Sequence, residues 1–246
     1  MPYTKDGIKY PRCTQIIGDC TDKSGALVQW AANCCVEWIR ENSDAIEYED
    51  AFGERFYAVT DEDLNKARFA YKTVSDKALD VGSEVHNAIE EVLKIQLLQI
   101  KQKYGGQLIP ELSCEQAQNA YNAFLDWAQE HKLRPIELEK TVYGSRWAGT
   151  LDIVCEYDNK IFVIDWKTSK RFYMSEMGAQ IAAYRSCVPE AEGCGILRLD
   201  KTTGQPEFKD FSKRYESDLR VFNAMVELYY LRHPRIRKRF EHIMPF

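Results

Sequence analysis

The stretch GTLDIVCEYDNKIFVIDWKTSKRFYMSEMGAQIAAY, residues 149–184, decides the fold of this chain. Two apolar runs of strand length lie on either side of a tight Asp-Asn-Lys connection at residues 158–160, and a helix-like segment follows them. The first run carries Asp152 in its middle. Because strand side chains alternate between two faces, Asp165 and Lys167 lie on one face of the second run. Such charges are costly to bury alone, so we expect them to compensate one another with help from a divalent cation.

Taken singly, each of these charges is typical of a strand end or of a salt bridge. Their combination is more specific, because a helix face that presents two polar side chains four residues apart follows the charged strands. The complete set is Gly149-x-x-Asp152, Asp165-Trp166-Lys167-Thr168 and Gln180-x-x-x-Tyr184. It indicates a functional site rather than a cap of the sheet.

This set resembles the RecB-type branch of the PD-(D/E)XK nuclease superfamily. The sequence around the motif is especially similar to mitochondrial genome maintenance exonucleases and related phage exonucleases. The strong resemblance covers roughly residues 136–187, and a weaker one extends upstream to His86. It implies an α/β fold with a restriction-endonuclease-like core, in which helices flank a mixed central sheet. We expect residues 1–72 to form a helical N-terminal elaboration that arches over the active site, and residues 73–246 to form the nuclease core.

The resemblance also implies the roles of individual residues. A lone histidine beside the apolar stripe of a helix is typical of an interior residue, but Gly82-x-x-x-His86 resembles the family's metal-binding histidine motif. Glu139 is either a further acidic site residue or half of a surface pair. The expected catalytic residues are Asp152, Asp165 and Lys167; the expected metal ligands are His86, Asp152, Asp165, the Trp166 carbonyl and, less firmly placed, Glu139; the expected DNA contacts are Thr168, Gln180 and Tyr184.

The chemistry that such a site favours is phosphodiester hydrolysis with Mg²⁺ or Mn²⁺. Neighbouring carboxylates raise the pKa of a lysine, so we assign Lys167 positioning and electrostatics before a role as base. By resemblance, the substrate is DNA with a single-stranded end, in phage or bacterial recombination, replication or repair. Two alternatives stay open: a non-specific endonuclease on the same fold, and a catalytically idle DNA-binding recombination partner.

Outside this stretch the sequence predicts mainly helices. Residues 43–72 alternate acidic and aromatic residues, which is typical of irregular covering helices; the resemblance favours the arch instead. A long helix is expected over residues 74–103, and a capping box of Ser113 and Gln116 is expected to open another through about residue 132. Residues 136–143 alternate, so Glu137 and Glu139 should point away from Ile136 and Leu138. Residues 195–199 and 205–211 read as further strands, before a final helix that opens at Ser212.

The composition is that of an ordinary globular protein, with 45% apolar and 29% charged residues among 246. No apolar run approaches a membrane span, and the start of the sequence has no leader pattern, so we expect a cytoplasmic protein without membrane contact. The net charge of −5 does not exclude a nucleic-acid enzyme, because binding can rely on a local basic groove. The charge is unevenly spread, since residues 44–54 are acidic and residues 232–239, RHPRIRKR, are basic. The eight cysteines form no Cys-x-x-Cys pair, and none follows Cys194. We therefore expect no iron–sulfur cluster.

Overall fold

The computed structural model describes residues 3–42, 48–49, 55–56, 59–97 and 112–240. The chain divides into two compact units, which we call the sheet unit (Met1–Thr21 with Gly82–Phe246) and the helical unit (Asp22–Val81). These units are defined by compactness alone. The expected division into an N-terminal elaboration, residues 1–72, and a nuclease core, residues 73–246, stays a prediction.

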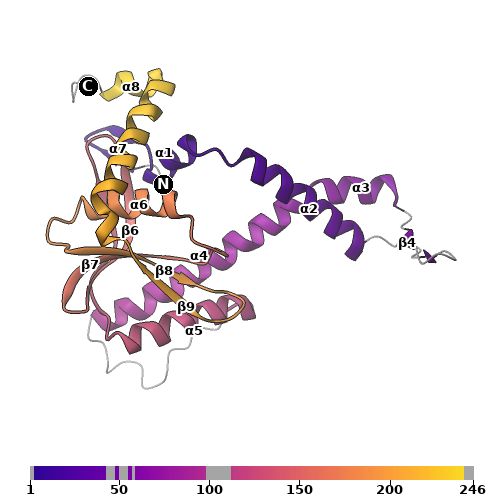
Figure 1. Cartoon of the computed structure of the whole chain (residues 1–246), viewed down its shortest axis with the longest axis horizontal. Coiled ribbons are helices and arrows are strands. Elements are labelled where there is room, and N and C mark those ends of the chain that lie inside the picture. Colours follow the sequence, from indigo (N-terminus) through magenta and orange to yellow (C-terminus); the bar gives the residue numbers. More distant parts are fainter. Residues whose placement is uncertain (1–2, 43–47, 50–54, 57–58, 98–111, 241–246) are drawn as a thin grey trace. The chain divides into compact units, whose positions relative to one another are not determined.

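A five-stranded mixed sheet forms the centre of the sheet unit, in the order β5-β6-β7-β8-β9 (Figure 1). Its strands are β5 (Arg134–Tyr143), β6 (Ala148–Tyr157), β7 (Lys160–Lys167), β8 (Gly193–Leu199) and β9 (Pro206–Asp210). Neighbouring strands are antiparallel except β7 and β8, which are parallel and are joined through helix α6 (Met174–Arg185). Helices flank the sheet on both faces, which confirms the expected mixed α/β architecture.

The hairpin between β6 and β7 confirms the tight connection that the sequence predicted. Tyr157 pairs with Lys160, and the two residues between them, Asp158 and Asn159, have φ angles of 52° and 59°. Asp and Asn adopt this left-handed conformation more readily than most residues, and two such residues match the twist of the flanking strands. The hairpin therefore fixes the register of the two strands that carry Asp152 and Asp165.

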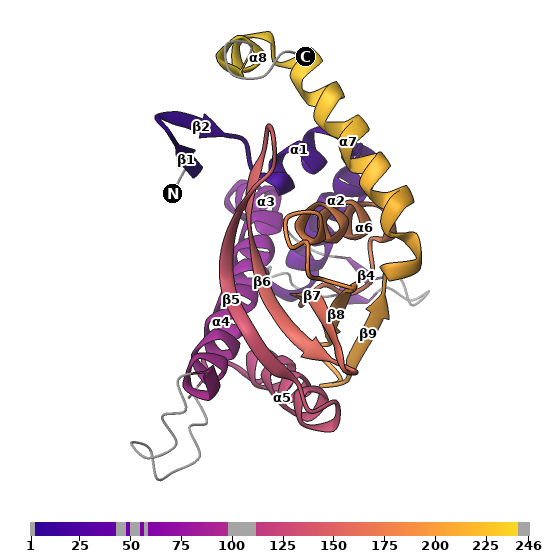
Figure 2. The ribbon, with the colours of Figure 1, turned by 90° about the vertical axis from the view of Figure 1, so that its left-hand side faces the viewer.

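Strand β5 departs from the strict alternation that the sequence predicted. Its pairing with β6 shifts between Pro135 and Glu137, and Glu139 has a φ of 46°. Ile136 is 46% exposed instead of buried, because the irregularity interrupts the alternation at that point. Figure 2 shows β5 and β6 as one long curved hairpin, with the short hairpin of β1 (Tyr3–Lys5) and β2 (Ile8–Tyr10) at one end.

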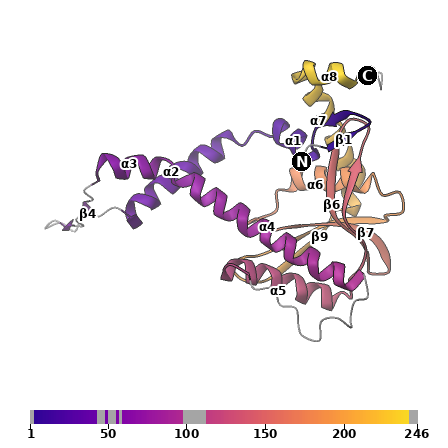
Figure 3. The same ribbon diagram turned by 180° about the vertical axis from the view of Figure 1, so that it is seen from behind.

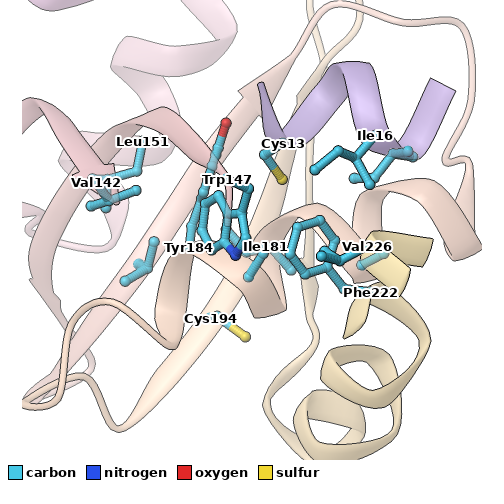
Figure 4. Packing of buried hydrophobic residues seen from close by; sticks show 14 of the residues in the cluster. Cys13, Ile16, Val142, Trp147, Leu151, Ile181, Tyr184, Cys194, Phe222 and Val226 are labelled. Atoms are coloured by element: carbon cyan, nitrogen blue, oxygen red, sulfur yellow. The ribbon is translucent and has the colours of Figure 1, made fainter. Parts of the chain in front are cut away.

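One face of the sheet packs against α6, α1 (Cys13–Cys20) and α7 (Tyr215–Arg232), which follows the short helix η1 (Ser212–Arg214). Figure 4 shows Trp147, which directly precedes β6, and Phe222 of α7 close together in this core, with ring centroids 5.1 Å apart. Helix α8 (Pro234–Phe240) follows α7, and its Phe240 is fully buried. Buried aromatic and aliphatic area of this kind is the dominant source of stability in such a unit.

The other face of the sheet is covered by α5 (Glu115–Glu130) and by the part of α4 (Ala70–Leu97) from Gly82 onward (Figures 1 and 3). Phe124 of α5 packs on Trp166 of β7, with ring centroids 5.6 Å apart. The expected capping box at Ser113 is wrong: the residue that caps α5 is Cys114, without a side-chain hydrogen bond. Instead, the Ser113 amide and hydroxyl both donate to the carboxylate of Glu84 on α4, at 2.6 and 2.5 Å. Ser113 is therefore bound to another helix and does not cap α5.

The helical unit contains α2 (Ser24–Asn42), α3 (Asp61–Arg68), the first turns of α4, and the short strands β3 (Tyr48–Glu49) and β4 (Arg55–Phe56). A capping box opens α3, because the Asp63 amide donates to Thr60 Oγ1 at 3.2 Å and the Thr60 amide donates to Asp63 Oδ2 at 3.1 Å. Residues 43–47, 50–54 and 57–58 of the expected arch lie outside the described residues, as does the expected end of the long helix near residue 103. Among the described helices, none combines the length and apolarity that a membrane crossing requires.

Candidate active site

Two carboxylates meet where β6 and β7 separate. The pairing of these strands ends at Ile153 and Ile164, so Asp152 and Asp165 are the next residues in register and lie across from each other. In place of a further backbone bond, the Trp166 amide donates to Asp152 Oδ2 at 2.9 Å. The two aspartates are only 7% and 1% exposed. Burying two like charges side by side is unfavourable unless cations or hydrogen-bond donors compensate them.

Part of that compensation comes from the chain itself. The Lys167 ammonium forms an ion pair with Asp165 Oδ2. Gln180 of α6 donates through Nε2 to Asp165 Oδ1 at 3.2 Å and to Tyr184 Oη at 3.4 Å. Apart from the ion pair, Asp165 Oδ2 is buried and receives no hydrogen bond of good geometry from the described residues. The site thus keeps a carboxylate oxygen with capacity for a cation.

The titration behaviour of the cluster follows from the same crowding. Burial raises the pKa of Asp152 well above its usual value, and the charge of Asp165 adds to this, while Lys167 and the Trp166 amide oppose it. For Lys167, burial disfavours the charge, but Asp165 and Asp152 together outweigh burial and raise the pKa. Lys167 is therefore a cation at neutral pH, which agrees with an electrostatic role rather than that of a base.

His86 reaches the cluster from α4, on the opposite side from Gln180. Its Nδ1 lies 3.7 Å from Asp152 Oδ1, and its ring lies against the ring of Trp166 with centroids 5.9 Å apart. Burial, then the charge of Lys167, lower the pKa of His86 to about 4, although Asp165 and the Trp166 backbone oppose the shift. The imidazole is neutral at pH 7, and the neutral form is the one that binds a metal ion.

Glu139 lies at the edge of this cluster. On β5, Glu139 falls between two residues that pair with β6, in the pairs Leu138–Ile153 and Lys140–Leu151. It therefore lies across from Asp152. Burial raises its pKa, and the charges of Glu90 and Asp165 raise it further. Its positive φ departs from regular strand geometry. Both alternatives for Glu139, a further acidic residue of the site or half of a surface pair, therefore stay predictions.

The remaining predicted residues lie beside the site rather than on an open surface. Gln180 and Tyr184 are 8% and 3% exposed, so their position braces Asp165 and β6, and their expected DNA contact stays a prediction. Tyr184 packs directly on Gly149, where an added Cβ would lie 2.6 Å from ring atom Cε1. Thr168 approaches α4 in the same way, with Oγ1 at 3.2 Å from a Cβ built on Gly82. Glycine at these two positions lets the neighbouring elements come close to the carboxylates.

One neighbour of the site was missed by sequence reasoning. Cys13, the first residue of α1, is fully buried, and its thiol has a pKa raised by burial and by the charge of Asp165. A cysteine far from the motif in the sequence carries no local signal for this position. Only the packing of α1 against the sheet brings it there.

The donor set of the cluster fits a hard divalent cation. Two carboxylates and a backbone carbonyl supply the oxygen ligands that Mg²⁺ prefers, and an imidazole is compatible with Mn²⁺ as well. Within the described residues, no three His, Cys, Asp or Glu side chains lie together as a ready-made metal cage. A cation held here would thus complete its coordination with backbone oxygen and water, as Mg²⁺ commonly does.

A family model described as PD-(D/E)XK nuclease superfamily matches residues 53–228 of the chain. The chain belongs to the PD-(D/E)XK nuclease superfamily. The pattern in the superfamily's name occurs here as Asp165-Trp166-Lys167, at the end of β7. PD-(D/E)XK proteins are nucleases, their substrate class is DNA, and they generally use divalent metals such as Mg²⁺ or Mn²⁺.

No curated protein matches the chain. Among solved structures, the one titled "Crystal structure of SSO0001" is similar at 14% sequence identity, over 59% of this chain and 72% of that chain, with a TM-score of 0.29. The assignment to the PD-(D/E)XK superfamily therefore rests on the family model, and the described sheet agrees with it.

Proposed function

We propose that this chain is a Mg²⁺- or Mn²⁺-dependent deoxyribonuclease of the RecB-type branch, which degrades DNA from single-stranded ends. The setting we propose is recombination, replication or repair in the cytoplasm of a bacterial or phage-infected cell. The observation that carries the proposal is the meeting of Asp152 and Asp165 at the open end of the β6–β7 ladder, with Lys167 paired to one of them. Two buried carboxylates beside a lysine form a poor structural salt bridge, because one negative charge is left over.

The proposed roles follow from the positions of the residues. Asp152, Asp165 and the Trp166 carbonyl would hold the metal ion, with His86 completing the set on the side of α4. The bound ion would activate a water molecule and neutralise charge at phosphorus. Lys167, kept charged by its two aspartate neighbours, would orient that water and stabilise the pentavalent phosphorus.

The neighbours of these residues would keep the geometry rigid. Gln180 holds one oxygen of Asp165 and so fixes the direction of the other. Tyr184 holds β6 at Gly149 and is itself linked to Gln180. Thr168 would contact DNA or fix the turn after β7, and Glu139 would contribute a further acidic ligand. By family resemblance, residues 43–72 would form part of a helical arch that guides a single strand to the site.

Cleavage of end-labelled single-stranded DNA tests the proposal. We expect Mg²⁺ or Mn²⁺ to support stepwise shortening of the strand and EDTA to stop it. Asp165→Ala and Lys167→Ala should each lower the rate at least about 1000-fold, because each removes charge at the transition state. Glu156→Ala and Lys160→Ala remove one acidic and one basic side chain of the same β6–β7 hairpin, away from the site, and should cleave at the wild-type rate.

A covalently closed single-stranded circle separates the exonuclease from the endonuclease alternative, since only an endonuclease opens a circle. An idle DNA-binding protein would retain the labelled strand in a binding assay and give no metal-dependent product. Wild-type rates in the Asp165→Ala protein would show that the reaction does not take place at this site.

A further inference from the structure

The basic sequence near the end of the chain forms part of a second charged surface in the sheet unit. Helix α8 turns Ile236 and Phe240 inward, where Phe240 is fully buried. The side chains of Arg235, Lys238 and Arg239 are exposed, and none of the three pairs with an acidic side chain of the described chain. Their neighbours differ: Arg232 and His233 both bind Asp19, at 3.5 and 3.0 Å. Among the described residues, the charges of Arg235, Lys238 and Arg239 are therefore left without an acidic partner.

The β1–β2 hairpin adjoins α8 and adds further positive charge. The ring of Tyr10 lies between Phe240 and Tyr143, with centroid distances of 5.1 and 5.3 Å. Figure 2 shows the hairpin and α8 at the same end of the unit. The hairpin and the residues after it expose three more basic side chains, Lys5, Lys9 and Arg12. We call the set Lys5, Lys9, Arg12, Arg235, Lys238 and Arg239 the basic platform.

The basic platform is attached to the strand that carries Asp152. Tyr3 Oη and Thr150 Oγ1 share a hydrogen bond of 2.9 Å, and the Ala148 amide donates to the Pro11 carbonyl at 3.0 Å. Thr150 lies two residues before Asp152 on β6. From Ala148 to Asp152 the strand rises about 13 Å, at about 3.3 Å per residue. That distance spans about four phosphates of a stacked, B-like strand at about 3.4 Å each, and about half as many of an extended single strand.

We infer that the basic platform binds the phosphate backbone of the DNA substrate, about two nucleotides or more from the bond that is cut. The inference rests on the proposed function, because it places the cut at Asp152 and Asp165. A chain with a net charge of −5 needs a local cationic surface to hold a polyanion. This one is fixed to the site through β6, and its arginines and lysines can contact phosphates of any sequence.

The test compares three triple variants. Arg235→Gln/Lys238→Gln/Arg239→Gln removes the α8 charges of the platform. The variant Arg235→Lys/Lys238→Arg/Arg239→Lys keeps the charge, and Lys132→Gln/Lys160→Gln/Lys213→Gln removes the same charge elsewhere on the unit. All six positions are exposed, so equal thermal midpoints are expected and would show that the fold is intact.

Each protein is given single-stranded substrates that extend about one or about twenty nucleotides beyond the scissile bond, which is below and above the estimated reach. On the long substrate, the α8 glutamine variant should show a higher KM and an unchanged kcat. Its plot of log KM against log salt concentration should be flatter by about two, since each lost phosphate contact removes about 0.7. On the short substrate it should equal the wild type, and the two other triple variants should equal the wild type on both.

Equal KM and salt dependence in the α8 glutamine variant and the wild type would overturn the inference. So would an equal loss on short and long substrates, because it would place the effect in the site itself. Loss of binding to phosphatidylserine vesicles with DNA binding intact would assign the platform to a membrane surface instead. DNA binding measured by fluorescence anisotropy in EDTA gives the same comparison without cleavage, so the platform can be tested even if the proposed nuclease activity fails.

Discussion

The sheet unit and the helical unit bury their apolar side chains to very different extents. In the sheet unit, Trp166 and Phe222 are at most 1% exposed. In the helical unit, Val28 and Leu79 are 70% and 69% exposed, and among its described residues the buried ones are few and small, such as Ala67. Since buried apolar area is the main favourable term in folding, the sheet unit has the greater local stability. The candidate site lies on the well-packed unit, where carboxylates can be held in one geometry.

The largest expected difference is in core truncation. Phe222→Ala removes a fully buried ring from its contact with Trp147 and should lower the free energy of unfolding by about 3–5 kcal/mol. Leu79→Ala in the helical unit removes a mainly exposed side chain and should change it by no more than about 0.5 kcal/mol. Urea unfolding followed by circular dichroism measures both values. Similar losses in the two variants would mean that Leu79 is buried in solution, and the contrast between the units would then fail.

Replacing a glycine by alanine should have smaller effects on the free energy of unfolding, and their sign should differ between the two units. Gly149→Ala forces a methyl group against Tyr184, whose ring is held by Trp147 and by the bond from Gln180, and should cost about 1–3 kcal/mol. A Cβ on Gly25 of α2 meets no atom within 4 Å, so Gly25→Ala should be neutral or stabilise by up to about 1 kcal/mol.

A double-mutant cycle isolates the cause at Gly149. In a Tyr184→Ala background, the methyl group has room, and most of the cost of Gly149→Ala should disappear. If the cost persisted in that background, the contact with Tyr184 would not be the reason for glycine in the Gly149-x-x-Asp152 motif.

The sequence predicted the parts of this fold that depend on local chemistry. The alternation around Asp152 and Asp165 and the Asp158–Asn159 turn sufficed for the hairpin, because turn type fixes register. The four-residue spacing of Gln180 and Tyr184 predicted a shared helix face, and the two side chains do bond to each other. The placement of His86 beside Asp152 came from family resemblance alone, since a histidine in an amphipathic helix carries no signal of its own.

Other features depend on contacts between distant segments and could not be read locally. The irregular φ of Glu139 lies in a segment that alternates like an ordinary strand. Ser113 has the sequence of a helix cap, but Glu84 of another helix takes its hydrogen bonds. The burial of Cys13 near Asp165 requires that α1 dock on the sheet. In each case, a tertiary partner overrides a local preference.

The smallest expected difference between the two units is in how single carboxylates affect stability as the pH falls. In the sheet unit, Asp200 accepts bonds from the Thr203 and Thr202 amides and pairs with Arg198, and these partners lower its pKa. A carboxyl with a lowered pKa in the folded state stabilises the protein above its unfolded pKa of about 3.9, and this contribution is lost as the pH falls through the folded value. Asp200→Asn should therefore cost up to about 1 kcal/mol at about pH 7 and progressively less in acid.

Asp63 is the counterpart in the helical unit, because its bonds to Thr60 also lower its pKa. It lies at the surface, in the capping box of a short helix, so Asp63→Asn should leave the global unfolding transition unchanged. Its effect should be faster amide hydrogen exchange at the start of α3, where the cap normally prevents fraying. Urea unfolding at about pH 7 and about pH 3, together with exchange at neutral pH, measures both responses. A shift of the global transition by Asp63→Asn as large as that by Asp200→Asn would show that the two units unfold as one, since a local cap can affect global stability only if its helix is part of the same cooperative structure.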